Sequence, residues 1–196
     1  KNVQNTKGFW VGRYETSNMQ NSSTRVKVGS KKGTTNGINN VTWYRMYAQQ
    51  SLYSELVIGT SNTSKLSNMI WGSQWDQIMI WMKEIKSSEQ AQSRGKYYVT
   101  NGAGKGNYGV IDGVDDENSS RISPATTGSK DFYMVKNVFD LAGNVDEWTL
   151  EDSFGNRIPR GGYFNSKDIS YTKPDYRNAL LPVNRSSSIG SRLVLY

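Results

Sequence analysis

The sequence contains no cysteine and no histidine. It therefore has no disulfide, no thiol nucleophile, no imidazole base and no Cys/His ligand set for zinc. Acid–base chemistry is left to Asp, Glu, Lys and Tyr, and the sequence shows no carboxylate pair in an obvious apolar setting that would separate two pKa values. No apolar run approaches the ~20 residues of a membrane-spanning helix, so we expect no membrane insertion.

The length and composition predict a folded chain with a modest aliphatic core. The 196 residues are 35% hydrophobic, with a mean hydropathy of −0.69. This length suits one domain of generous size or two small ones. The 6 Trp and 12 Tyr add core area, because aromatic side chains bury large surfaces. The start at Lys1 suggests a processed chain or the C-terminal domain of a longer chain.

The charge is unevenly distributed along the chain, whose formal net charge is +7. Residues 1–35 hold seven Lys and Arg against one acid, and residues 160–196 hold six against two. Residues 110–152 reverse this, with ten acids against three bases. An acidic centre between basic ends favours a cation-binding loop over a continuous nucleic-acid footprint, so we expect no nucleic-acid partner.

Residues 137–149 read Asn-Val-Phe-Asp-Leu-Ala-Gly-Asn-Val-Asp-Glu-Trp-Thr. The apolar spacing fits neither a helix of period 3.6 nor a strictly alternating strand. One interpretation is a buried loop whose oxygen atoms hold a hard cation. The other is a turn in which Asn and Asp side chains bond their own backbone. The pattern alone leaves both open.

This stretch resembles the signature loop of the formylglycine-generating-enzyme (sulfatase-modifying-factor) family, a branch of the C-type-lectin-like fold. Three further segments fall in the family's order, at residues 8–16, 160–163 and 189–193. The resemblance implies a single α+β domain over 1–196, with two helices packed on small antiparallel sheets and long irregular loops. The chain departs from the family at Asp146, where an aromatic residue is common, and at Ser191, where Phe is usual.

The resemblance also implies a structural calcium ion. The family's ligands correspond to the side chains of Asp140 and Glu147 and the backbone carbonyls of Gly143 and Val145. Asp146 would add to the field of the ion or point to solvent. The alternative is that the two carboxylates satisfy backbone donors without a metal. The family's copper enzymes need Cys and its iron-dependent relatives need His, so we expect no copper, iron or zinc site and no enzyme activity.

Residues 160–196 form the candidate variable ligand-binding region. Their Tyr, Ser and Asn content is typical of adaptable binding surfaces, although polar loops share it. Arg160-Gly161-Gly162 followed by Arg185 and Ile189-Gly190-Ser191-Arg192-Leu193 resembles the variable region of proteins diversified by diversity-generating retroelements. The candidate ligand-binding residues are Tyr163, Asn165, Ser166, Asp168, Tyr171, Tyr176, Asn178, Asn184, Ser186, Ser187 and Ser188.

These resemblances imply a non-catalytic domain that binds a protein or glycan on a cell surface, located outside the cell, on a bacterial surface or on a phage virion. The alternatives are a structural or interaction domain of a larger surface protein, and a cryptic enzyme of the sulfatase-modifying-factor family. The sequence indicates neither the ligand nor the oligomeric state.

The local patterns predict two helices and three main strands. Thr42 is the expected N-cap of a helix over 43–57, and Ser73 that of a helix over 74–85. Strands are expected over 7–17, 157–164 and 191–196, with the last pairing with the first.

Overall fold

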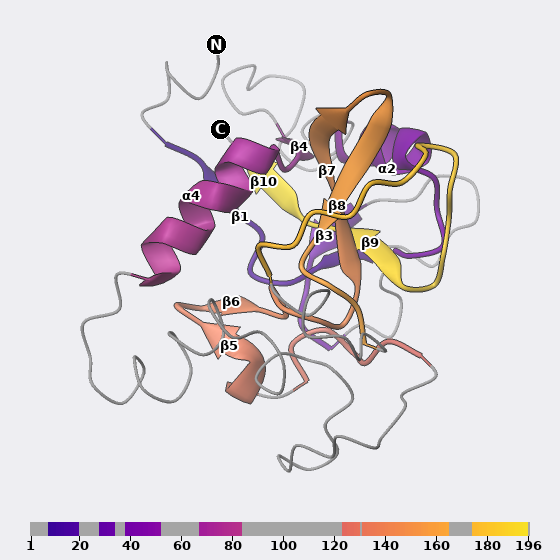
Figure 1. The fold of residues 1–196 in the computed structure, drawn as a ribbon. Coiled ribbons are helices and arrows are strands. Elements are labelled where there is room, and N and C mark those ends of the chain that lie inside the picture. Colours follow the sequence, from indigo (N-terminus) through magenta and orange to yellow (C-terminus); the bar gives the residue numbers. More distant parts are fainter. Residues whose placement is uncertain are drawn as a thin grey trace, which may run out of the picture.

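The structure, a computed structural model, describes residues 8–19, 28–33, 38–51, 67–83, 123–129, 131–164 and 174–195. These ranges hold the helices α2 (Trp43–Ser51) and α4 (Gly72–Lys83) and the 3-10 helix η2 (Asp131–Tyr133) (Figure 1). Their strands are β1 (Trp10–Val11), β2 (Thr16–Asn18), β3 (Val28–Ser30), β4 (Ser67–Met69), β5 (Met134–Val135), β6 (Val138–Phe139), β7 (Asp146–Ser153), β8 (Asn156–Arg160), β9 (Ile189–Ser191) and β10 (Leu193–Leu195).

The strands form small sheets that bring distant parts of the chain together. One has the order β1-β10-β4, with Trp10 paired to Leu195 in antiparallel register. The predicted pairing of the last strand with the first is therefore confirmed. A second sheet has the order β8-β7-β9, in which β9 runs parallel to β7. The other two sheets are the antiparallel pairs β2-β3 and β5-β6.

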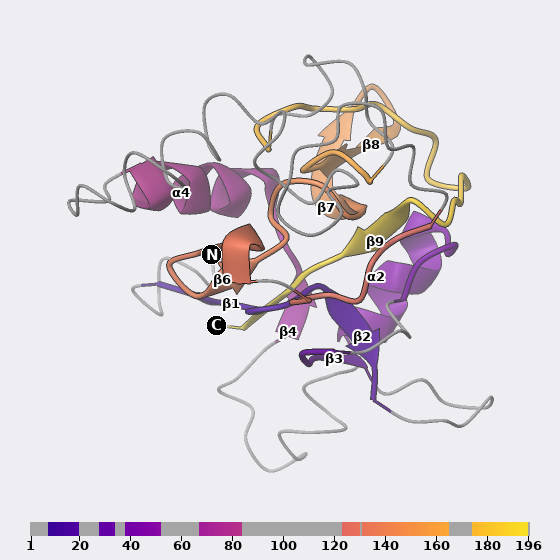
Figure 2. The same ribbon diagram turned by 90° about the horizontal axis from the view of Figure 1, so that it is seen from below.

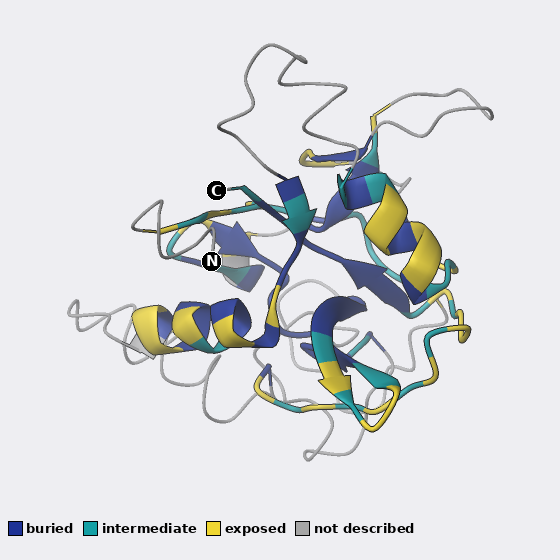
Figure 3. Cartoon of the chain, turned by 90° about the horizontal axis from the view of Figure 1, so that it is seen from above, coloured by how far each residue is buried: buried dark blue, intermediate teal, exposed yellow. Residues whose placement is uncertain are grey.

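Two hydrophobic clusters lie on opposite sides of β10, because adjacent strand residues point to opposite faces. Val194 joins a cluster beneath α4 that includes Trp75 and Met82, together with residues of the β5-β6 hairpin. Leu193 joins a cluster beneath α2 that includes Trp43 and residues of β4, β7 and β9. Figure 3 shows both helices buried on the inner face and exposed on the outer one.

The two helix starts differ in how well they follow the prediction. The N-cap at Thr42 is confirmed, since its Oγ1 accepts a hydrogen bond from the Arg45 amide at 3.4 Å. The second helix begins at Gly72, so the N-cap predicted at Ser73 is wrong. The carbonyl of Trp71 accepts the first helical hydrogen bond from Trp75, and the Gln74 side chain accepts one from the Trp71 amide at 2.9 Å. A side chain three residues into the helix thus caps it.

Two predicted strands are shorter than expected. The strand predicted over 7–17 is divided into β1 and β2, which lie in different sheets. The strand predicted over 157–164 ends at Arg160, because Gly161 and Gly162 have φ angles of 99° and 74°. A Cβ atom at Gly161 would lie 2.8 Å from the carbonyl oxygen of Leu141, so only glycine fits this close approach.

Residues 138–150, which include most of the signature loop, are buried without exception. The backbone takes left-handed φ angles at Asp140 (53°), Gly143 (84°) and Asn144 (60°). Asn, Asp and Gly tolerate this conformation far better than other residues. The turns of the loop thus account for the mixture of residue types that breaks its helix and strand patterns.

Candidate ligand-binding site

The described C-terminal segment, residues 174–188, lies along β8 before the chain enters β9 (Figures 1 and 2). Arg157 and Leu180 exchange two backbone hydrogen bonds, of 2.8 and 3.0 Å, and Arg160 forms an antiparallel bridge with Arg177. These contacts extend the sheet by an irregular edge. The segment is therefore held by backbone pairing while most of its side chains remain exposed or half-buried.

A ring of four charged side chains fastens the same segment to the scaffold. Arg160 on β8, which is fully buried, binds Asp76 at 2.7 Å and Glu151 at 3.1 Å. Arg177 in the C-terminal segment binds the other oxygen of each carboxylate, at 2.7 and 2.8 Å. Each carboxylate thus bridges two guanidinium groups, which is a geometry that arginine supports well. The ring ties the segment to α4, β7 and β8.

A cavity of about 290 Å³, here called the C-terminal cavity, opens between this segment and the start of β7. Its lining includes five of the predicted ligand-binding residues: Tyr163, Asn178, Asn184, Ser186 and Ser188. The Ser186 and Ser188 hydroxyls lie 2.8 Å apart, and the backbone N–H of Asn184 donates to the Leu181 carbonyl at 2.9 Å. Side chains separated by up to 25 positions in the sequence thus meet around one space.

The other predicted ligand-binding residues lie elsewhere. Tyr176 is half-buried and Ser187 is exposed, and neither lines the C-terminal cavity. The Ser187 carbonyl instead accepts a hydrogen bond from the Asn39 side chain at 2.9 Å. Four more residues lie outside the described part of the chain: Asn165, Ser166, Asp168 and Tyr171.

Asp146 lines the C-terminal cavity and is only 4% exposed. Its carboxyl accepts hydrogen bonds from the Gly162 amide and the Asn178 side chain, yet Oδ1 has no hydrogen-bond partner among the described residues. Burial raises the pKa of Asp146 to about 7. One sequence interpretation expected the Asp146 side chain to point to solvent, and its burial shows that this is wrong. Its departure from the family's aromatic residue was the signal that could have placed it in the site.

Comparisons with known proteins identify the fold. No protein-family model and no curated protein matches the sequence. Three similar solved structures are Treponema denticola variable protein 1 (TM-score 0.55, 15% identity), PvdO from Pseudomonas aeruginosa (0.55, 17%) and CarF (0.57, 15%). Each match covers 95% of this chain, and 84%, 80% and 85% of the other chain, respectively.

The fold is C-type-lectin-like. The resemblance to the formylglycine-generating-enzyme type of this fold, and to variable proteins, is thereby confirmed. Identities of this size establish the fold alone. What the chain does must therefore be argued from its own residues.

Within this C-type-lectin-like fold, Glu147 follows Asp146 in sequence but has a different environment. Arg192 donates from Nε to Glu147 Oε2 at 3.0 Å and from Nη2 to Oε1 at 2.6 Å. Its guanidinium also donates to the backbone carbonyls of Gly12 and Phe139, at 2.9 and 2.8 Å. Both side chains are buried. Arg192 therefore joins β7, β6 and the segment after β1.

Asp140, the other predicted side-chain ligand for calcium, also has protein partners. Its Oδ2 accepts hydrogen bonds from the Gly128 amide at 2.7 Å and the Thr127 hydroxyl at 3.1 Å. Among the described residues, no group of three or more Asp, Glu, His or Cys side chains is placed to hold a metal ion.

In this arrangement, the oxygen atoms of Glu147 are not available as ligands for a calcium ion. The Arg192 guanidinium occupies both carboxylate oxygens, and its positive charge would repel a dication at Glu147. The geometry favours the alternative in which the two carboxylates bind protein donors. The calcium site at Asp140, Gly143, Val145 and Glu147 stays a prediction.

The C-terminal cavity offers hydrogen bonding and contact area. The Asp146 carboxyl supplies one unused acceptor oxygen, and the rim supplies hydroxyls, carboxamides and the Tyr163 ring. Such a lining suits a polar ligand that makes several hydrogen bonds, with the aromatic ring providing apolar contact. In the described ranges, no helix is long and apolar enough to cross a membrane.

Proposed function

We propose that this chain is a non-catalytic recognition domain that binds a protein or glycan on a cell or phage surface through the C-terminal cavity and its rim. Such a domain would act outside the cell, on a bacterial surface or on a phage virion. The observation that carries the proposal is the convergence of Tyr163, Asn178, Asn184, Ser186 and Ser188 around the unused oxygen of Asp146. The fold shared with Treponema denticola variable protein 1 supports it.

The way the C-terminal segment is attached also supports this function. The Arg160 ring and the backbone pairing with β8 hold residues 177–180 independently of the side chains that face the cavity. Substitutions at Asn184, Ser186 or Ser188 would therefore change the binding surface without removing these contacts. A rigid frame with replaceable side chains is what a diversified binding protein needs.

One test requires no ligand. Sequencing the DNA around the gene should reveal a near-copy of the codons for 160–196 that differs only at adenines, beside a reverse-transcriptase gene. The differing codons should include those of the residues that line the C-terminal cavity. If both elements are absent, the diversified form of the proposal is wrong, and a fixed binding or structural domain remains.

A second test measures recognition directly with a glycan array and with whole bacterial cells as probes. The variant Tyr163→Ala/Asn178→Ala/Ser186→Ala should lose binding while its far-ultraviolet circular dichroism stays unchanged. Tyr44→Ala is the matched control, because Tyr44 is a 55%-exposed aromatic residue on the outer face of α2. Equal loss in both variants, or no binding by the wild type to either probe, would contradict the proposal.

A further inference from the structure

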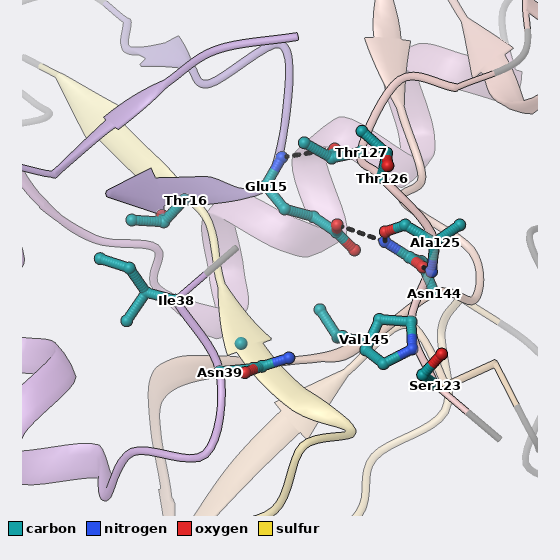
Figure 4. Close-up of a pocket in the computed structure, with 12 residues that line it drawn as sticks. Glu15, Thr16, Ile38, Asn39, Ser123, Ala125, Thr126, Thr127, Asn144 and Val145 are labelled. Carbon is teal, nitrogen blue, oxygen red and sulfur yellow. Dashed lines mark hydrogen bonds between the residues drawn. The ribbon is translucent and has the colours of Figure 1, made fainter. Parts of the chain in front are cut away.

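A second cavity, of about 300 Å³, is lined in part by Asn144 and Val145 of the signature loop (Figure 4). Val145 and Gly190 line this second cavity, whereas their sequence neighbours Asp146 and Ile189 line the C-terminal cavity. The two spaces are thus separated by the chain segments that enter β7 and β9. The second cavity, here called the Glu15 cavity, belongs to none of the functions considered so far.

Glu15 provides the polar centre of this cavity. The residue is 5% exposed, and Figure 4 shows the carboxylate pointing into the space between Ile38 and Asn144. Oε2 accepts a hydrogen bond from Asn144 Nδ2 at 2.6 Å, whereas Oε1 has no partner among the described residues. A buried carboxylate oxygen without a donor is costly, so a ligand that supplies one would gain affinity.

The neighbouring amide cannot turn to satisfy Oε1. Asn144 Oδ1 accepts a hydrogen bond from the Ala125 amide at 2.7 Å, and Nδ2 donates to the Ala125 carbonyl at 3.2 Å as well as to Glu15. Both ends of the carboxamide are therefore engaged. The Glu15 backbone amide is held in turn by the Thr127 hydroxyl at 3.3 Å. The unpartnered oxygen is thus held beside the cavity that Glu15 lines.

The charges around the cavity favour a cation. Glu15 is the one ionisable side chain among the described lining residues, which include no Lys or Arg. Burial raises the pKa of Glu15, and the nearby carboxylates of Asp140 and Glu147 raise it further. The positive charge of Arg192 lowers it. A bound positive charge would relieve the repulsion between these carboxylates.

The walls indicate which kind of cation would fit. Ile38, Val145 and Ala125 present methyl groups, while Ser123 and Thr126 supply hydroxyl acceptors nearer the exposed rim. A divalent metal ion prefers six or more oxygen ligands and several carboxylates, which this lining does not provide. A primary ammonium on a short alkyl chain matches better, because it carries three donors and an apolar stem.

We propose that the Glu15 cavity binds a primary ammonium group, carried by a small alkylamine or by a lysine side chain, with the Glu15 carboxylate as its counter-ion. The alkyl stem lies against Ile38 and Val145, and the ammonium donates to Glu15 Oε1. This site does not depend on the function proposed for the C-terminal cavity.

The experiment is a titration with n-butylammonium chloride, followed by the amide signals of Asn144 and Glu15 in two-dimensional NMR. Neutral 1-butanol, butyrate and calcium chloride are titrated in parallel. Glu15→Gln keeps the shape and an acceptor for Asn144 but removes the charge, and should weaken n-butylammonium binding at least tenfold. Asp175→Asn is the matched control, because it removes the same charge from an exposed position.

A second variant, Ala125→Leu, narrows the cavity without changing its charge and should also weaken binding. Two results would overturn the proposal: equal binding of 1-butanol and n-butylammonium, or unchanged ammonium binding by Glu15→Gln. Calcium binding at these signals in place of the amine would overturn it too. Nα-acetyl-lysine methylamide distinguishes a lysine side chain from a small alkylamine as the natural ligand. Tighter binding than that of n-butylammonium indicates a lysine side chain, and equal binding indicates a free amine.

Discussion

Two adjacent carboxylates, Asp146 and Glu147, occupy opposite kinds of environment. Glu147 gives both oxygens to Arg192, which also ties down two backbone carbonyls. Asp146 is also buried and lines the C-terminal cavity, but one of its oxygens has no partner among the described residues. Successive residues of a strand point to opposite faces, so one side of β7 serves the frame and the other serves a site. For these two neighbours, complete pairing accompanies a structural role, and incomplete pairing accompanies a place in the candidate site.

The largest effect should follow from opening the paired side. Arg192→Met leaves the Glu147 carboxylate buried without a counter-charge, and removing one partner of a buried ion pair typically costs about 3–5 kcal/mol. We expect the free energy of unfolding, measured with urea, to fall by that amount.

Two further variants test whether this loss comes from the unpaired charge. Arg185→Met removes the same group from an exposed position and should change stability by no more than about 0.5 kcal/mol. Glu147→Gln combined with Arg192→Met should recover part of the loss, because the orphaned charge is gone. If Arg192→Met is as stable as the wild type, the buried pair does not hold the frame.

The titration of Asp146 should appear in the pH dependence of the free energy of unfolding. Burial raises the pKa of Asp146 to about 7 in the folded state from its ordinary value of 3.8. The folded state therefore binds this proton more tightly than the unfolded state. The contribution of Asp146 to stability should be greatest below about pH 4, fall as pH rises, and level off above about pH 7.

Asp146→Asn removes this titration, since the carboxamide cannot ionise and its oxygen still accepts a hydrogen bond from Gly162. We expect the variant to be more stable than the wild type at pH 8, by about 1–3 kcal/mol. The measurement is the urea midpoint at intervals between pH 4 and pH 8. Parallel pH profiles for the two proteins would show that Asp146 is not penalised by burial.

The sequence was sufficient for several features that depend on neighbouring residues, although the N-cap predicted at Ser73 is wrong. The Thr42 cap follows from local hydrogen-bonding chemistry, and the signature loop follows from a rare combination of residue types. Features that depend on contacts distant in sequence were not predictable in this way. The pairing of Glu147 with Arg192 spans 45 residues, and it is this pairing that changes the interpretation of the calcium ligands.

The residues of the C-terminal cavity could be predicted from the sequence only in part. Composition selected Tyr163, Asn178 and Ser186, which do line the cavity, but it also selected Tyr176 and Ser187, which do not. Residue type gives no information about the direction of a side chain in an irregular loop. Asp146 was missed as part of the site because it was read only as a neighbour of the expected metal ligands.

A smaller effect should follow from loosening the segment that carries the site. Arg177→Met opens the four-residue ring, but Arg160 still binds both Asp76 and Glu151 from its buried position. Arg177 is about half exposed, so we expect a loss of about 1 kcal/mol in global stability. Hydrogen exchange at the Leu180 amide, which pairs with Arg157, should increase more than exchange in β7. Equal increases in both places would show that the ring supports the whole frame.

The smallest expected effect concerns calcium. If Arg192 rather than a metal ion satisfies Glu147, addition of EDTA should move the melting temperature by less than about 1 °C, because no ligand-binding energy is lost. A fall of several degrees that added calcium reverses would instead support the ligand set Asp140, Gly143, Val145 and Glu147. The Arg192→Met variant sharpens this test: freeing the Glu147 oxygens should create calcium-dependent stability that the wild type lacks. A calcium response already present in the wild type and absent from the variant would mean that Arg192 supports a metal site, and the contrast between the two sides of β7 would no longer hold.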